Sequence, residues 1–232
     1  MTTRTPKRTL SPGALWAGMA AIVGGAVAIA LTIPIASAYF RAYEAFDAHP
    51  IWLPFIERAL APLLEFAPPV TVYEIYGRIY AVVFILYLPA AIHLHRQRSE
   101  RSGRLEAVGF AVVAGALVTT AIGVAADYWA NGIGYTLSLL GLLGLVIGST
   151  VWGLGVRRGG TVPTWWAWLL IAVGPLSVLC LFLLGHVPSG PTLPFAVAWL
   201  LLGWLFVTGR ATNRISAPLA DTQPLRKGSP DP

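Results

Sequence analysis

Charged side chains are scarce in this chain: they make up only 11% of its 232 residues, whereas 56% of the residues are hydrophobic. A soluble domain usually carries about 25% charged residues, because polar groups must cover its surface. A chain this poor in charge could not cover such a surface, and intrinsic disorder requires low hydrophobicity. The composition therefore predicts an integral membrane protein.

Cysteine is nearly absent too, since Cys180 is the only one. A single cysteine excludes an intramolecular disulfide and any metal cluster held by several thiolates. Catalytic signatures are also missing: the chain contains no Gly-x-Ser-x-Gly, no His-Glu-x-x-His and no phosphate-binding glycine loop followed by lysine. These absences favour a non-catalytic protein.

The histidines do not predict a metal or haem site. His93 and His95 fall at one end of a predicted span, whereas His186 falls at the opposite end of another. The two ends of a span are about 30 Å apart across the hydrocarbon core, so these histidines could not ligate one haem together. The sequence therefore predicts no cofactor and no bound metal.

Long apolar runs are what the chain does have. A helix needs about 20 mostly apolar residues to cross a bilayer. Buried strands of globular proteins run about 4–8 residues. Strands of a transmembrane barrel alternate between polar and apolar residues. The runs are too long, and too apolar on every face, for either kind of strand. We therefore expect an all-α polytopic transmembrane bundle of six spans, at residues 14–39, 72–94, 107–126, 133–156, 164–184 and 193–207.

The basic residues predict the orientation of the spans. Of the 16 lysines and arginines, 13 lie in the N-terminal tail, the alternate connections and the C-terminal tail. Positively charged loops remain in the cytoplasm, so both termini are expected there, in a bacterial plasma membrane. We expect residues 1–13 to form a cytoplasmic tail, 14–209 the membrane domain and 210–232 a disordered cytoplasmic tail. This split distribution explains the net charge of +6 without nucleic acid, so the bilayer is the expected partner.

Two features of the N-terminal region leave alternatives open. Ala36-Ser37-Ala38 resembles a signal-peptide cleavage site, and cleavage there would leave five spans. The apolar stretch before it is longer than a usual signal core of about 7–15 residues, which favours a retained first span.

Residues 51–66, rich in large apolar side chains, are too few to span the bilayer. They predict a short extracytoplasmic interfacial helix, with a re-entrant loop as the alternative.

The fourth span carries regularly spaced glycines, and Gly144 forms a small-xxx-small pair with one of them. Glycine lets helix backbones approach closely in lipid, so we expect this helix to be central and tightly packed, within the monomer rather than across a homodimer. The predicted packing residues are Gly134, Gly141, Gly144, Gly148 and Gly155.

Charged residues inside a span are costly and mark functional candidates. Glu74 and Arg78 are four residues apart on the second span, so they share one helix face, and Asp127 ends the third. Since these two spans should be antiparallel neighbours, we expect Arg78 to point into the bundle and to pair with a carboxylate. The predicted outer polar cluster is Glu74, Arg78, Asp127, Asn131 and His186.

The last third of the chain resembles a recurrent pattern of a basic turn, a proline, tryptophans and an apolar run. It reads Gly153-Leu154-Gly155, two arginines, then Val162-Pro163-Thr164-Trp165-Trp166-Ala167-Trp168. The pattern is similar to one in many uncharacterised bacterial multi-pass membrane proteins, and the resemblance implies no functional residue.

The function expected is a non-catalytic one, as a sensor, an accessory subunit or an envelope-associated factor. A membrane-protein partner or a homodimer would fit such a role. A small-solute transporter or channel is the first alternative, which the scarcity of polar groups in mid-span disfavours. An intramembrane enzyme acting on a lipid-like substrate is the second, with Glu74, Asp127 or His186 as the candidate groups.

Overall fold

The structure, a computed structural model, describes residues 11–43, 50–97, 103–130, 132–159 and 162–211. This part of the chain contains helices and no strand. The helices are α1 (Pro12–Ala42), α2 (Leu53–Leu64), α3 (Pro69–Arg96), α4 (Arg104–Trp129), α5 (Tyr135–Gly159), α6 (Thr164–Leu184) and α7 (Ser189–Val207). Six of them are long and apolar enough to cross a membrane. The predicted all-α bundle of six spans, with one additional short helix, is therefore confirmed, and the chain is a multi-pass membrane protein.

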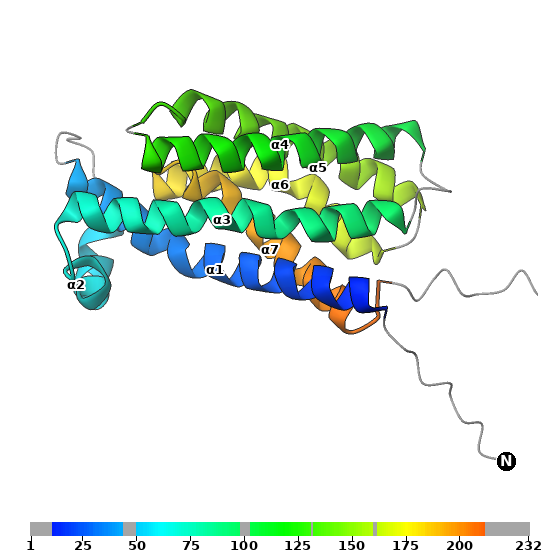
Figure 1. The fold of residues 1–232 in the computed structure, drawn as a ribbon, viewed down its shortest axis with the longest axis horizontal. Coiled ribbons are helices and arrows are strands. Elements are labelled where there is room, and N and C mark those ends of the chain that lie inside the picture. The colour runs from blue at the N-terminus through cyan, green and yellow to red at the C-terminus, as the bar shows by residue number, and fades with distance from the viewer. Residues whose placement is uncertain (1–10, 44–49, 98–102, 131, 160–161, 212–232) are drawn as a thin grey trace, which may run out of the picture.

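The spanning helices form a closed ring. Each packs against two neighbours, in the order α1, α3, α4, α5, α6, α7 and back to α1. The last turn of α7 and the first turn of α1 lie at the same end of the bundle (Figure 1). Consecutive helices are mostly ring neighbours because short connections favour antiparallel packing. As a result, side chains from several distant segments meet at each end of the ring.

Large aromatic side chains fill the middle of the ring, and Trp199 on α7 is their centre. Its ring stacks on Phe195 at 3.9 Å between centroids and lies 6.0 Å from Trp152 on α5. Its indole nitrogen donates a hydrogen bond to the backbone carbonyl of Tyr87 on α3 at 3.0 Å. The Trp166 indole on α6 likewise donates to the Ala198 carbonyl at 2.8 Å. The Trp199 and Trp166 indoles are thus buried with their polar atoms satisfied, and the aromatic groups join four helices through the core.

The glycine stripe of α5 lies against α4. A Cβ atom on any of the five glycines would come within 3.0 Å of an α4 atom, a separation that real Cβ atoms essentially never show; the five are Gly134, Gly141, Gly144, Gly148 and Gly155. The close approach is therefore made within one chain. The main neighbours of α5 are α4 and α6, so the helix lies in the wall of the ring, whereas the glycine pattern had predicted a central helix.

The observed spans run somewhat longer than the apolar runs predicted. The clearest difference is α7, which begins at Ser189 instead of residue 193. Pro191, which had marked a boundary, lies in its first turn, where a backbone N–H has no helical partner to lose. The charged ends of α3 and α4 also continue the helix beyond the apolar core.

Helix α2 lies across one end of the bundle (Figure 1). Leu53 and Leu64 are buried, whereas Phe55 is 81% exposed. The chain on either side of α2 is fixed by hydrogen bonds: the Trp52 indole donates to the Leu183 carbonyl at 2.8 Å, and Tyr76 donates to the Leu63 carbonyl at 2.6 Å. A short helix with exposed apolar side chains at the end of a bundle fits the predicted interfacial helix.

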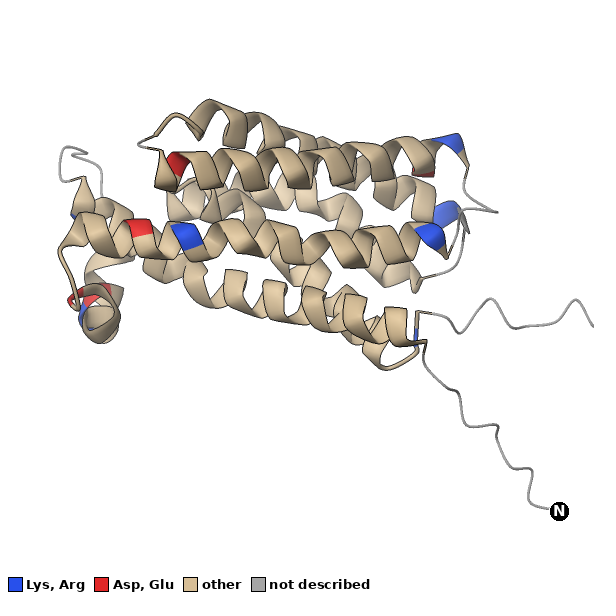
Figure 2. Cartoon of the chain, viewed as in Figure 1, with Lys and Arg blue, Asp and Glu red and all other residues tan. Residues whose placement is uncertain are grey.

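The two ends of the ring differ in charge (Figure 2). The end where α3 stops and α4 starts carries most of the described basic residues: Arg96, Arg104, Arg157, Arg158 and Arg210. We call this the arginine end. Among the described residues, its one acidic side chain is that of Glu106. The opposite end combines three arginines with four acidic residues: Arg41, Arg58, Arg78, Glu57, Glu65, Glu74 and Asp127. Most of the C-terminal tail predicted at residues 210–232, and most of the predicted N-terminal tail, lie outside the described residues.

Candidate functional site

A cavity of about 600 Å³ lies at the end of the bundle opposite the arginine end. We call it the tyrosine pocket, because five of the eight tyrosines in the chain line it. Its lining residues are Tyr39, Tyr43, Tyr73, Glu74, Asp127, Tyr128, Gly132, Tyr135, Gly185, His186 and Val187. Four segments that are far apart in the sequence therefore build this one site.

The pocket arises where helix ends converge. The end of α1 supplies two tyrosines, the first turns of α3 supply Tyr73 and Glu74, and the last turn of α4 supplies Asp127 and Tyr128. The start of α5 and the α6–α7 connection complete the wall. That connection begins at Gly185, whose positive φ of 66° ends α6 in a left-handed conformation that suits glycine.

Three tyrosines form a continuous aromatic wall. The ring centroid of Tyr39 lies 5.2 Å from that of Tyr43 and 5.5 Å from that of Tyr73, and the Tyr43 and Tyr73 centroids are 5.8 Å apart. The Tyr128 ring continues the wall at 5.1 Å from Tyr73. These separations are typical of favourable tilted and edge-to-face aromatic pairs, so the wall is well packed.

His186 closes the buried side of the pocket. It is only 1% exposed, and its ring lies 4.9 Å from that of Tyr39. Nδ1 shares a hydrogen bond of 2.8 Å with the Ser189 hydroxyl, and Nε2 shares one of 3.4 Å with the Tyr73 hydroxyl. Burial disfavours the charged imidazolium and lowers the pKa of His186 to about 3. The imidazole is therefore neutral at physiological pH.

Tyr128 joins α4 to α3 because Gly77 leaves room for it. A Cβ at Gly77 would overlap the Tyr128 ring. Tyr128 is 5% exposed, and its hydroxyl makes no hydrogen bond of normal geometry to any described residue, the Tyr73 phenol being its polar neighbour. A buried phenol normally has a hydrogen-bond partner, and the polar group nearest to this covered hydroxyl is the Tyr73 phenol.

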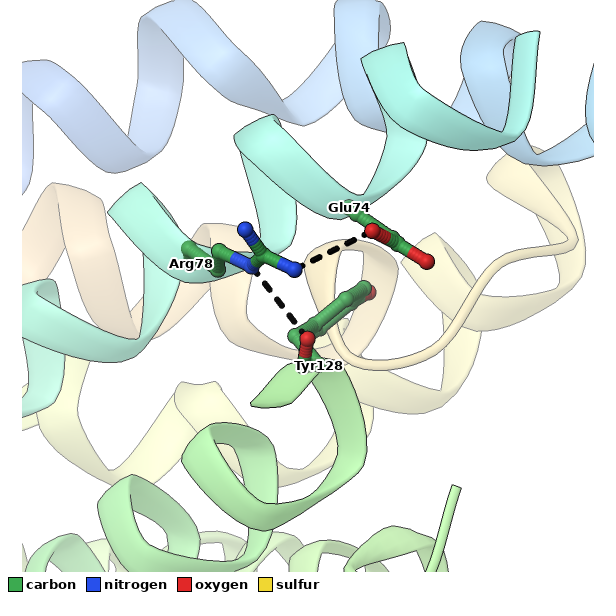
Figure 3. A network of polar contacts seen from close by, with 3 residues as sticks. All are labelled: Glu74, Arg78 and Tyr128. Carbon is green, nitrogen blue, oxygen red and sulfur yellow. Dashed lines mark hydrogen bonds and ion pairs between the residues drawn. The ribbon is translucent and has the colours of Figure 1, made fainter. Parts of the chain in front are cut away.

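Arg78 is not among the residues that line the pocket, but it contacts two residues that are, Glu74 and Tyr128 (Figure 3). Its guanidinium is 3.1 Å from the Glu74 carboxylate, and Nε donates to the backbone carbonyl of Tyr128 at 3.3 Å. It also lies 6.0 Å from the Trp129 ring centroid. The predicted pairing with a carboxylate is therefore present. The side chain remains 41% exposed and bridges α3 and α4 at the surface, so the prediction that it points into the bundle is wrong.

The predicted outer polar cluster is thus brought together in part. Glu74, Asp127 and His186 line the pocket, and Arg78 borders it through Glu74. Asn131 lies outside the described residues. The sequence interpretation missed the tyrosines, because an aromatic residue at the end of a span is usually an interface anchor. The available signal was that five tyrosines fall at span ends on one predicted side of the membrane.

Within the described ranges, no group of three or more histidine, cysteine, aspartate or glutamate side chains could hold a metal ion. The pocket instead combines aromatic surface, two rim carboxylates and a neutral imidazole, which suits non-covalent recognition. Comparison of the chain with protein families, curated proteins and solved structures gives no match.

Proposed function

We propose that this protein is a non-catalytic membrane protein that binds a small ligand in the tyrosine pocket, as a sensor, an accessory subunit or an envelope-associated factor. The observation that supports this role is the cavity of about 600 Å³ itself. Ligand sites are typically concave, largely apolar pockets of about 300–1,000 Å³ with a few convergent polar groups. The pocket has a volume in that range, an aromatic wall and convergent polar groups in Glu74, Asp127 and His186, and it is more polar than a typical site of this kind.

We further propose that the pocket faces away from the cytoplasm. Five described arginines against one glutamate lie at the arginine end, and three arginines against four acidic residues lie at the pocket end. Under the positive-inside rule, this asymmetry favours a cytoplasmic arginine end, with both termini in the cytoplasm of a bacterial cell. Ligand would then enter from the extracytoplasmic side.

A binding pocket is favoured over a transport path by the packing below it. Between the pocket and the arginine end, the ring is filled by fully buried aromatic side chains; they include Tyr80, Phe84, Tyr87, Phe195, Trp199, Trp152 and Trp166. A conduction path requires polar, hydrated space at mid-membrane. In this conformation the pocket is closed toward the arginine end.

A binding role is also favoured over an enzymatic one. Both imidazole nitrogens of His186 already have partners in Tyr73 and Ser189. Ser189 is fully buried and is not part of the pocket lining, so it is not placed to attack a bound substrate. With its pKa at about 3, His186 would be a weak general base at neutral pH.

The proposal is tested with a variant that fills the pocket. Val187→Trp places a large side chain in the cavity, and Val70→Trp places the same side chain on an exposed site of α3 at the same end. Both proteins and the parent, purified in nanodiscs, are screened for thermal stabilisation by amines, organic anions, sugars and nucleosides. We expect at least one class to stabilise the parent and Val70→Trp saturably, and Val187→Trp by at least tenfold less at equal concentration.

Two results would contradict the proposal. The first is that no compound class raises the melting temperature of the parent. The second is that a stabilising compound acts equally on Val187→Trp. Size-exclusion profiles and unliganded melting temperatures establish that the variants fold. If Val187→Trp does not fold, Tyr135→Trp on the half-exposed rim of the pocket replaces it, with the same expectation.

A further inference from the structure

We propose that the tyrosine pocket recognises an organic ammonium group, either a primary amine or a quaternary ammonium. This inference rests on the proposed ligand-binding function and names the class of ligand. It is carried by three features of the pocket: its tyrosines, its rim carboxylates and the hydroxyl of Tyr128.

The tyrosines supply the first feature. Aromatic faces attract cations through the ring quadrupole, and cages of several aromatic rings bind quaternary ammonium groups. Tyr39, Tyr43 and Tyr73 form one wall with centroid separations of 5.2–5.8 Å, and Tyr128 and Tyr135 also line the cavity. Since Tyr43 and Tyr135 are 43% and 49% exposed, the aromatic lining runs from the rim to the buried wall.

The rim carboxylates supply the second feature. Among the described residues, the lining includes Glu74 and Asp127 but no lysine or arginine. Glu74 is partly neutralised by Arg78, whereas Asp127 has no ion-pair partner among the described residues. Because His186 is neutral, the lining carries net negative charge. Such a lining attracts cations and repels anions, so a phosphate or carboxylate ligand is disfavoured.

The Tyr128 hydroxyl supplies the third feature. It is buried in the wall and makes no hydrogen bond of normal geometry within the described part of the chain. This oxygen is covered in the unliganded structure, so it accepts a hydrogen bond from an N–H of a primary ammonium only if the neighbouring side chains move. A quaternary ammonium would instead be held by the rings and the carboxylates, so comparing the two ammonium types reports on this hydroxyl.

The closing experiment compares a cation with its neutral isostere. The full chain is placed in phosphatidylglycerol nanodiscs, and equilibrium binding of choline, ethanolamine and 3,3-dimethylbutan-1-ol is measured at low ionic strength. The last compound has the shape of choline with carbon in place of nitrogen. We expect choline or ethanolamine to bind at least tenfold more tightly than 3,3-dimethylbutan-1-ol, and Val187→Trp to abolish the binding.

Variants of Tyr43 separate the electrostatic attraction of an aromatic ring for the cation from the apolar contact that any large side chain provides. Tyr43→Phe retains an aromatic face, so we expect choline binding within about twofold of the parent, whereas Tyr43→Leu should weaken it about fivefold or more. Asp127→Asn should weaken binding about threefold or more at low salt. Glu57→Gln on α2, which does not line the pocket, is the matched control and should leave binding unchanged.

The lipid composition of the nanodiscs shows whether the ammonium group comes from a lipid headgroup or from a soluble amine. If a lipid headgroup occupies the pocket, phosphatidylcholine in the nanodiscs should suppress binding of free choline, and if a soluble amine is the ligand it should not. Equal binding of the neutral isostere would overturn the inference, as would equal effects of Tyr43→Phe and Tyr43→Leu. If another class of compound binds and Val187→Trp blocks it, the proposed function holds and the ammonium inference fails.

Discussion

Arg78 on α3 donates a hydrogen bond to the backbone carbonyl of Tyr128 at 3.3 Å, in the last turn of α4. That carbonyl lies at a helix end, where backbone acceptors lack helical partners. The same guanidinium pairs with Glu74, four residues earlier on its own helix. One cation therefore ties together two helices that line the tyrosine pocket.

Removing this cation should loosen the pocket. We expect Arg78→Ala to lower the free energy of unfolding by about 1 kcal/mol, a modest value because the group is partly exposed and screened. Arg58→Ala on α2 is the matched control and should have less effect, since no ion pair or hydrogen bond involves Arg58 within the described residues. Unfolding in mixed detergent micelles measures both variants. Equal losses would reduce Arg78 to a surface charge.

The packing of α5 on α4 allows a second pair of variants. Gly141→Leu or Gly148→Leu should overpack the interface and destabilise the bundle by about 1–3 kcal/mol. Gly115→Leu on α4 is the matched control, because a Cβ there would meet nothing within 4 Å. Thermal melting in detergent compares the three proteins. Melting of both α5 variants at the temperature of the control would show that the interface tolerates the added side chain.

The orientation of the bundle is tested separately from its packing. A reporter active only in the cytoplasm, fused to the C-terminus, should be active, because both ends of the chain are expected on the side of the arginine end. In a Cys180→Ser background, Tyr135→Cys at the pocket rim should react with a membrane-impermeant maleimide added to intact cells. A silent reporter on an inserted protein, together with a Tyr135→Cys variant that is labelled only after lysis, would reverse the proposed orientation.

The spans could be predicted from the sequence because a bilayer imposes one dominant requirement. A helix that crosses hydrocarbon must be apolar over about 20 residues, and local sequence carries that information without tertiary contacts. The boundaries were less accurate: α7 begins at Ser189, before the predicted start at residue 193, and so includes Pro191. Proline in a first turn is tolerated because the lost N–H has no helical acceptor there.

The pocket could be predicted only in part, because it depends on the order of the helices in the ring. Glu74 and Asp127 could be predicted, because placing a charged side chain in lipid costs free energy and both residues lie at the ends of spans. Tyr39 and Tyr135 are far apart in the chain and each resembles an interface anchor by itself. They became members of one site only when α1 and α5 were placed at the same end of the ring. The direction of the Arg78 side chain was also predicted wrongly, since this long side chain reaches the exposed surface of α3 and α4.

His186 gives the final prediction, which concerns the pH dependence of stability. The histidine is buried against Tyr39, Tyr73 and Ser189, in a cavity that Glu74 and Asp127 also line, and burial lowers its pKa from 6.5 to about 3. The unfolded chain would bind a proton near pH 6.5, whereas the folded protein would not. The contribution of the neutral His186 to stability is therefore fully present above the pKa of the unfolded chain. It is lost as the pH falls from about 6.5 toward 3.

Between pH 7.5 and 5 we expect the free energy of unfolding to fall by about 2 kcal/mol, at about 1.4 kcal/mol per unit below pH 6.5. His186→Gln should reduce this dependence, whatever the stability of the variant at neutral pH, because glutamine does not titrate. Glu57→Gln on α2 leaves His186 and the pocket lining in place, so it should retain the slope and serves as the control. Unfolding free energies measured in micelles across this pH range test the expectation. If His186→Gln keeps the parental slope, the imidazole is not held neutral by burial, and the floor of the pocket is more hydrated than its packing indicates.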